Sequence, residues 1–266
     1  MIGVFDSGIG GLTVAKKIWD ILGPLKIIYF GDTARVPYGN RGNEVIRKYT
    51  NEGVNFLLKK GAKIIIIACH TASAICQEEF KNFNLPIFDV VKPTVKAAVA
   101  NVREKNKRIG IIGTRATVNS RIYEKLIKKE CPSCQVFSRP APLLVPLIEE
   151  GWMKKVETKR ILKKYLKPLK NQRISVLVLG CTHYPLIKNL VEIKIGKQTK
   201  IIDPGEEVAK NLQEFLKNHP KIREELPYGN SQFYFSDIGN YYPQIIERFL
   251  GKKVKCQRWD SNPQAF

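Results

Sequence analysis

The chain has 266 residues, of which 45 are Lys or Arg and 24 are Asp or Glu, so its formal net charge is +21; 44% of its residues are hydrophobic. This length allows one large domain or two small ones. The apolar content excludes a disordered protein, and no apolar run approaches the roughly 18–20 residues that span a bilayer. The N-terminus lacks the basic and apolar segments of a secretory signal, so we expect a cytoplasmic protein.

Short apolar runs alternate with longer amphipathic stretches along the chain. This alternation predicts an α/β fold in which helices cover mostly parallel sheets. The predicted strands, in chain order, are 2–5, 27–30, 64–68, 86–91, 109–112, 176–179, 199–202 and 233–235. The predicted helices are 11–22, 44–60, 72–83, 93–104, 119–129, 157–169, 206–218 and 242–250.

Two parts of the chain are weakly similar to each other. MIGVFDSG near the start is similar to RIGIIGTRAT further on, and IIIIACHTAS is similar to VLVLGCTHYP. We therefore expect two similar, pseudo-symmetric α/β domains with the active site in the cleft between them. The first domain comprises 1–95 and 206–255, the second comprises 96–205, and 256–266 form a polar, frayed tail.

Most of the positive charge lies in the middle of the chain. Residues 96–205 contain 24 basic and 8 acidic residues, a surplus of 16. Such a surplus is typical of proteins that bind nucleic acid or another anionic partner, and this is one alternative function. The aromatic residues of this segment are few and are not interleaved with the basic runs, which disfavours a nucleic-acid platform. Lysines on helices are more often solvated surface.

Cys69 and Cys181 each follow an apolar strand and precede polar residues. Both therefore lie at the carboxyl edge of a sheet, where open α/β folds bind ligands. A lone buried cysteine is usually a small hydrophobic side chain. Here the neighbouring histidines, His70 and His183, favour a pair of reactive thiols, because an adjacent imidazole can hold a thiolate or relay its proton.

The turn after the first strand contains Asp6 and three glycines. Gly8, Gly10 and Gly11 would let the backbone approach an anionic group at a helix N-terminus. Thr13 stands where a dinucleotide-binding fingerprint has its last glycine, so we expect no nicotinamide site.

The other four cysteines have no such context. Cys131 and Cys134 have CxxC spacing, but one pair supplies too few ligands for a structural zinc site, and it follows a helix rather than a strand. We therefore expect no metal site, and reduced thiols rather than disulfides.

Six stretches resemble the glutamate racemase family in order and spacing. They are FDSGIGGLTV, YFGDTARVPYGNR, ACHTASA, IGIIGTRATVNS, LVPLIEEGW and LGCTHYP. The resemblance covers about residues 1–250, and its GCTH motif differs from the GCTE usual in related aspartate racemases. It implies interconversion of L- and D-glutamate without pyridoxal phosphate or any other cofactor. It also implies that the D-glutamate supplies peptidoglycan.

The resemblance further implies two thiol bases on opposite faces of the substrate α-carbon. Cys69 would deprotonate D-glutamate and Cys181 would deprotonate L-glutamate, while the other thiol returns a proton. Asp6 would assist Cys69, and Glu149 and His183 would assist Cys181. The implied substrate-binding residues are Asp6, Ser7, Tyr38, Gly39, His70, Thr71, Thr114, Thr117, Thr182 and His183.

Three of these assignments have structural alternatives. Thr114 and Thr117 can simply cap the helix that follows them. Tyr38 can serve only in packing, and Glu149 can be an ordinary surface carboxylate.

His70 departs from the family pattern, which usually has Asn after the first catalytic cysteine. We expect His70 to preserve the reaction but to shift its pH dependence, because imidazole titrates near neutral pH. The alternative is a related racemase with altered substrate choice, such as aspartate or another dicarboxylate. The expected partner is a small-molecule substrate rather than a membrane, and because the family is often dimeric the resemblance allows a homodimer.

Overall fold

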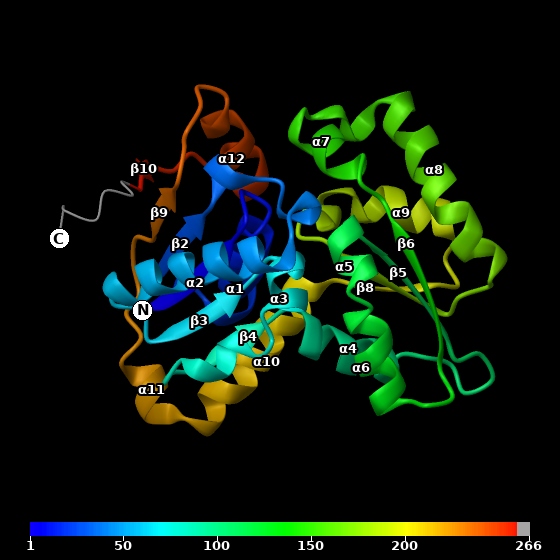
Figure 1. Cartoon of the computed structure of the whole chain (residues 1–266), viewed down its shortest axis with the longest axis horizontal. Helices are drawn as coiled ribbons and strands as arrows, with labels where there is room; N and C mark the ends of the chain where they lie inside the picture. The colour runs from blue at the N-terminus through cyan, green and yellow to red at the C-terminus, as the bar shows by residue number, and fades with distance from the viewer. Residues whose placement is uncertain (260–266) are drawn as a thin grey trace.

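The computed structural model describes residues 1–259 and contains two parallel sheets, one in each half of the molecule (Figure 1). The six-stranded sheet has the order β10-β9-β2-β1-β3-β4, and we call its half of the molecule the first lobe. The four-stranded sheet of the second lobe has the order β6-β5-β7-β8. The prediction of an α/β fold with parallel sheets is confirmed.

The strands of the first lobe come from both ends of the chain, whereas those of the second lobe come from one continuous stretch. The first-lobe strands are β1 (Ile2–Asp6), β2 (Ile27–Gly31), β3 (Ile64–Ile67), β4 (Ile87–Asp89), β9 (Gln232–Phe235) and β10 (Cys256–Arg258). The second-lobe strands are β5 (Arg108–Gly113), β6 (Gln135–Pro140), β7 (Val176–Gly180) and β8 (Lys200–Ile202).

Helices connect the strands and cover the sheets (Figure 1). The α-helices are α1 (Leu12–Leu22), α2 (Asn43–Lys59), α3 (His70–Ile75), α4 (Val91–Ala100), α5 (Arg115–Asn119), α6 (Ile122–Glu130), α7 (Leu144–Glu149), α8 (Val156–Asn171), α9 (Lys188–Ile195), α10 (Pro204–Asn218), α11 (Pro220–Glu224) and α12 (Tyr242–Leu250). Short 3₁₀ turns are η1 (Thr33–Arg35), η2 (Tyr38–Asn40), η3 (Glu79–Asn82), η4 (Trp152–Lys154) and η5 (Tyr184–Ile187).

The central strands are apolar at every position because both faces of the sheet are covered. In β3, Ile64 and Ile66 belong to the hydrophobic cluster that contains α1 and α10. Ile65 and Ile67 belong to a second cluster, which contains α2. Strand alternation therefore places successive isoleucines in different cores. The first cluster continues into the second lobe, so the two lobes share packed apolar surface.

All eight predicted strands are present, but two further strands were not predicted. β6 is an edge strand whose side chains are mostly half-buried or exposed, so it lacks the apolar run that marks the central strands. β10 lies within the predicted polar tail and pairs in parallel with β9, so the prediction of a frayed tail is wrong for 256–258. Its neighbour Trp259 packs on Phe30, with ring centroids 5.2 Å apart. The rest of the predicted tail, 260–266, lies outside the described residues.

Two predicted helices differ from the structure. The helix predicted over 72–83 is the shorter α3 followed by the 3₁₀ turn η3. The helix predicted over 119–129 corresponds to α6, which begins only at Ile122 because the preceding Arg121 has a left-handed φ of 55°. The short helices α5, α7, α9 and α11 were not predicted.

The expectation of reduced thiols throughout the chain is wrong for one pair. Cys131 and Cys134 form a disulfide at the turn between α6 and β6. Cys69, Cys76, Cys181 and Cys256 are free. Among the helices of residues 1–259, none has both the length and the apolar character needed to cross a membrane.

Gly53 of α2 allows the helix to approach β1 closely. A Cβ atom at this position would lie 2.5 Å from Cδ2 of Phe5 and 3.0 Å from the ring of Phe30. Both rings are fully buried and cannot move without disturbing the core.

We expect Gly53→Ala to lower the free energy of unfolding by up to about 2 kcal/mol. Overpacking a core typically costs about 1–3 kcal/mol, which exceeds the gain of about 1 kcal/mol from replacing a helical glycine by alanine. Denaturant unfolding measures the difference. Gly42→Ala is the matched control, because a Cβ there meets nothing within 4 Å. Equal stability of the two variants would contradict the close approach.

Candidate functional site

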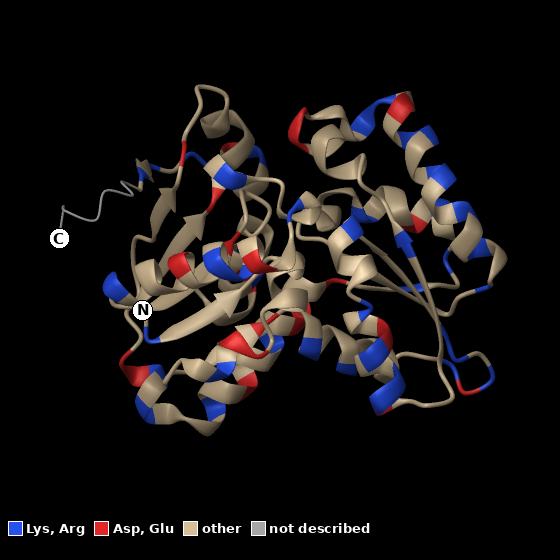
Figure 2. Ribbon diagram, viewed as in Figure 1, with Lys and Arg blue, Asp and Glu red and all other residues tan. Residues whose placement is uncertain are grey.

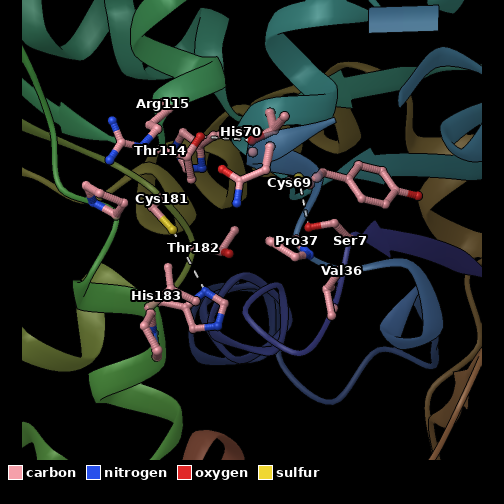
Figure 3. Close-up of a pocket in the computed structure, with 18 of the residues that line it drawn as sticks. Ser7, Val36, Pro37, Cys69, His70, Thr114, Arg115, Cys181, Thr182 and His183 are labelled. Carbon is pink, nitrogen blue, oxygen red and sulfur yellow. Dashed lines mark hydrogen bonds between the residues drawn. The ribbon is translucent and has the colours of Figure 1, made fainter. Parts of the chain in front are cut away.

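A cavity of about 350 Å³ lies between the lobes and is lined by residues from both (Figure 3). Small-molecule sites usually measure roughly 300–1,000 Å³, so its volume suits a small ligand. Eleven of the thirteen catalytic and substrate-binding residues that the resemblance implies line this cavity, as does Gly8 of the glycine turn. The eleven are Ser7, Tyr38, Gly39, Cys69, His70, Thr71, Thr114, Glu149, Cys181, Thr182 and His183.

Cys69 lies between the end of β3 and the start of α3, where it is the N-cap residue. Its Sγ atom donates a hydrogen bond to Ser7 Oγ at 3.2 Å and accepts one from Ala72 N at 3.5 Å. Burial raises the pKa of the Cys69 thiol to about 12, and the nearby negative charge of Asp6 acts in the same direction. Cys69 is therefore a neutral thiol at neutral pH.

Asp6 does not line the cavity but lies behind it, at the end of β1. Its Oδ2 atom accepts a hydrogen bond from Gly8 N at 3.0 Å and so holds the turn that carries Ser7. Burial raises the pKa of Asp6, and the charge of His183 opposes this shift.

At Gly10 the glycine turn packs closely against the second lobe. A Cβ atom on Gly10 would lie 2.5 Å from Nδ1 of His183 and would also collide with Thr182. Thr13 Oγ1 donates a hydrogen bond to the carbonyl oxygen of Thr182 at 2.8 Å. The absence of a side chain at Gly10 therefore lets the turns that carry Ser7 and Cys181 pack against each other.

Cys181 follows β7 and lies next to the ion pair of His183 and Glu149. Its Sγ atom lies 3.8 Å from His183 Nδ1, and His183 Nε2 lies 2.8 Å from Glu149 Oε1. Burial lowers the pKa of His183, but hydrogen bonds to Cys181 and Glu149 outweigh burial and raise the pKa to about 10. His183 is therefore an imidazolium at neutral pH. Glu149 is bound to the imidazole and is not an ordinary surface carboxylate.

Three threonine hydroxyls from the two lobes meet at the cavity. Thr71 Oγ1 lies 3.1 Å from Thr114 Oγ1, which lies 2.9 Å from Thr117 Oγ1. Thr114 also caps α5, because its Oγ1 accepts a hydrogen bond from Thr117 N at 3.2 Å. The capping alternative is thus correct for Thr114, which lines the cavity as well, whereas Thr117 is buried behind it.

The Tyr38 hydroxyl is already engaged in a hydrogen bond within the first lobe. It donates a hydrogen bond of 2.5 Å to the buried Asp32, which also accepts one of 2.7 Å from Arg35 Nε. Tyr38 consequently borders the cavity with its ring and backbone, next to Gly39. These contacts fix the loop that closes one side of the cavity.

His70 is buried against the second lobe, and its ring stacks on Tyr123 with centroids 6.3 Å apart. Burial lowers the pKa of His70 to about 3. A ring with this pKa is neutral at neutral pH, which opposes the expectation that His70 shifts the pH dependence; the pH profile of a His70 variant tests it.

Several residues that line the cavity were not singled out from the sequence. They are Val36, Pro37, Asn40, Arg115, Pro142, Val145 and Pro146. Asn40 and Arg115 lie inside the motifs PYGNR and TRAT, so their position in the sequence was a usable signal. Val145 and Pro146 of α7 lie inside the motif LVPLIEEGW, but their apolar side chains carry no binding chemistry that would single them out. Within residues 1–259, no group of three or more His, Cys, Asp or Glu side chains is arranged to hold a metal ion.

Known proteins of one family are similar to this chain in both sequence and structure. The family model for Asp/Glu/Hydantoin racemase matches residues 14–212. The glutamate racemase of Geobacter metallireducens is 40% identical over 254 residues, which cover 95% of this chain and 93% of that protein. A crystal structure of a glutamate racemase isoform from Bacillus anthracis has a TM-score of 0.92 at 33% identity and covers 98% of this chain and 97% of that one.

A second solved structure was determined with a ligand. The glutamate racemase of Francisella tularensis, in complex with D-glutamate, has a TM-score of 0.90 at 35% identity, over 98% of this chain and 97% of that one. Likeness of this extent, in sequence and in fold, places the chain in the Asp/Glu/hydantoin racemase family, among the glutamate racemases.

Proposed function

We propose that this chain interconverts L- and D-glutamate by a two-cysteine proton transfer in the cavity between the lobes. The observation that carries the proposal is that Cys69 and Cys181 line one cavity from different sheets, each with its own hydrogen-bonding partners. Inversion at a carbon atom needs a base on one face and an acid on the other, and two lobes that meet at a cavity can supply them.

The environments of the two thiols favour different roles at the start of the L-to-D reaction. Cys69 carries its proton, because burial raises its pKa to about 12, so it is ready to act as the acid. The His183 imidazolium next to Cys181 can donate a hydrogen bond to a thiolate there, which suits a base. Cys181 would take the α-proton of L-glutamate, and Cys69 would deliver its proton to the opposite face.

The carbanion formed between these steps needs stabilisation by fixed donors. The α-proton of an amino acid is much less acidic than a thiol, whose ordinary pKa is about 8.5. The hydroxyls of Thr71, Thr114 and Thr182 border the cavity and are suited to hold the substrate carboxylates. After transfer, the Cys69 thiolate would be held by the Ser7 hydroxyl and the Ala72 N–H.

Several wider expectations belong to the same proposal. The lobes correspond to domains at 1–95 with 206–255 and at 96–205, which the distribution of strands between the two sheets supports. From the family, we propose a cytoplasmic enzyme that supplies D-glutamate for peptidoglycan and assembles as a homodimer.

Purified protein in D₂O with reductant and no added cofactor should convert L-glutamate, with decay of circular dichroism and incorporation of deuterium at Cα. Cys69→Ser and Cys181→Ser should each lower kcat at least about 100-fold, the usual contribution of an acid or base. Cys256→Ser, which removes a free thiol outside the cavity, is the control.

Full activity of either cavity variant would refute the two-base assignment. L-Aspartate in the same assay tests the alternative substrate. Turnover of aspartate with none of glutamate would replace the proposed substrate but not the mechanism.

Glu149→Gln should move to lower pH the range in which the free energy of unfolding loses the contribution of His183 protonation. A folded-state pKa of about 10 against an ordinary value of 6.5 means that His183 protonation stabilises the fold fully below pH 6.5. That stability is lost as the pH rises through about 10. In Glu149→Gln the loss should occur at lower pH, as measured by denaturant unfolding and by NMR titration of the ring. The exposed neighbour Glu150→Gln is the control, and an unchanged His183 titration in Glu149→Gln would contradict the assignment.

His70→Asn should leave the pH profile of kcat/KM unchanged between about pH 5 and 9. With a pKa of about 3, His70 is neutral across this range and so contributes no titration to the profile. The measurement is a series of initial rates at constant ionic strength. A displacement of either limb of the profile by one pH unit would show that His70 titrates in the working range.

A further inference from the structure

Arg115 is the one Lys or Arg among the residues of the described chain that line the cavity. It begins α5, directly after Thr114, and its side chain is exposed. Figure 3 shows it beside Thr114, on the Cys181 side of the cavity. None of the ion pairs formed within residues 1–259 includes Arg115.

The other two charged side chains that line the cavity bind each other: His183 and Glu149 form an ion pair across 2.8 Å. Within the described lining, Arg115 is the charged side chain that has no ion-pair partner. A guanidinium binds carboxylates through a planar array of N–H donors.

The large basic surface of the second lobe is placed differently. Its densest part is α8, along which Figure 2 shows a row of basic residues. The exposed residues Lys159, Lys163 and Lys167 lie on this helix, and no residue of α8 lines the cavity. Exposed charges separated by more than about 8 Å are largely screened at physiological salt. Arg115 therefore differs from these lysines in position rather than in charge.

We propose that Arg115 is a specificity residue that binds the side-chain carboxylate of the substrate and thereby selects acidic amino acids over their amides. This rests on the proposed function, in which the thiols hold the α-carbon between them. The hydroxyls of Thr71 and Thr114 lie together next to Arg115, at 3.1 Å from each other, so donors for a carboxylate are already grouped on this side. Arg115 is exposed whereas Thr114 is half-buried and Thr71 is buried, so of these three groups Arg115 is the most accessible to an anion in solvent.

The experiment compares Arg115→Gln and Arg115→Lys with two controls. Arg41→Gln removes an exposed cation from a second pocket next to the cavity. Lys163→Gln removes an exposed cation from α8. Steady-state kinetics with glutamate are measured at low and at physiological ionic strength. Dissociation constants for D-glutamate and D-glutamine are measured by calorimetry.

Arg115→Gln should raise the KM for glutamate about tenfold and leave kcat nearly unchanged, the pattern of lost ground-state binding. It should weaken D-glutamate binding by a similar factor, leave D-glutamine binding unchanged, and remove the dependence of kcat/KM on ionic strength. Arg115→Lys should keep part of the effect, and both controls should behave as wild type.

The inference is overturned if Arg115→Gln leaves the KM unchanged, or if it weakens glutamate and glutamine binding equally, which would indicate a structural role. It is also overturned if Lys163→Gln has as large an effect. These outcomes are separate from failure of the proposed function. If the wild type does not racemise glutamate but binds it in an Arg115-dependent way, the proposed function fails and the recognition of an acidic side chain stands.

Discussion

The close contact between the glycine turn after β1 and the Thr182–His183 turn after β7 determines the geometry of the site. Gly10 has no room for a side chain, because His183 and Thr182 occupy that space. The same turn carries Ser7, which accepts a hydrogen bond from Cys69. One short segment of the first lobe therefore contacts the surroundings of both cysteines. Any change that moved this turn would disturb both the hydrogen bond to Cys69 and the contact with His183.

The two thiols share a cavity but not an electrostatic environment. Asp6 lies behind Cys69, and its negative charge together with burial keeps that thiol protonated. Cys181 instead faces an imidazolium that is stabilised by Glu149. The similarity of the two chain segments around the cysteines does not reveal this difference. It arises from α7, an element without a counterpart in the predicted pattern, which brings Glu149 to His183.

Much of the fold was predictable, because strands that are covered on both faces have continuous apolar sequences. β6 and β10 lie at sheet edges, and their composition is set by partial exposure, so no such run marks them. The residues that line the cavity were predictable where they belong to motifs that directly follow strands. The protonation state of His70 was not, because it depends on burial against Tyr123 from the other lobe. Arg115 lay within a known motif, but only the three-dimensional arrangement distinguishes it from the other basic residues of the chain.

The pairing of β10 with β9 at the edge of the first-lobe sheet has a consequence for biosynthesis. The four strands of the second lobe are all present once residue 202 has been made. The first-lobe sheet needs strands from both ends of the chain, so it stays incomplete until translation has passed residue 258. During synthesis β1 to β4 can pair with one another, but β2 lacks its neighbour β9, and their apolar surface lacks the cover of α10 and α12.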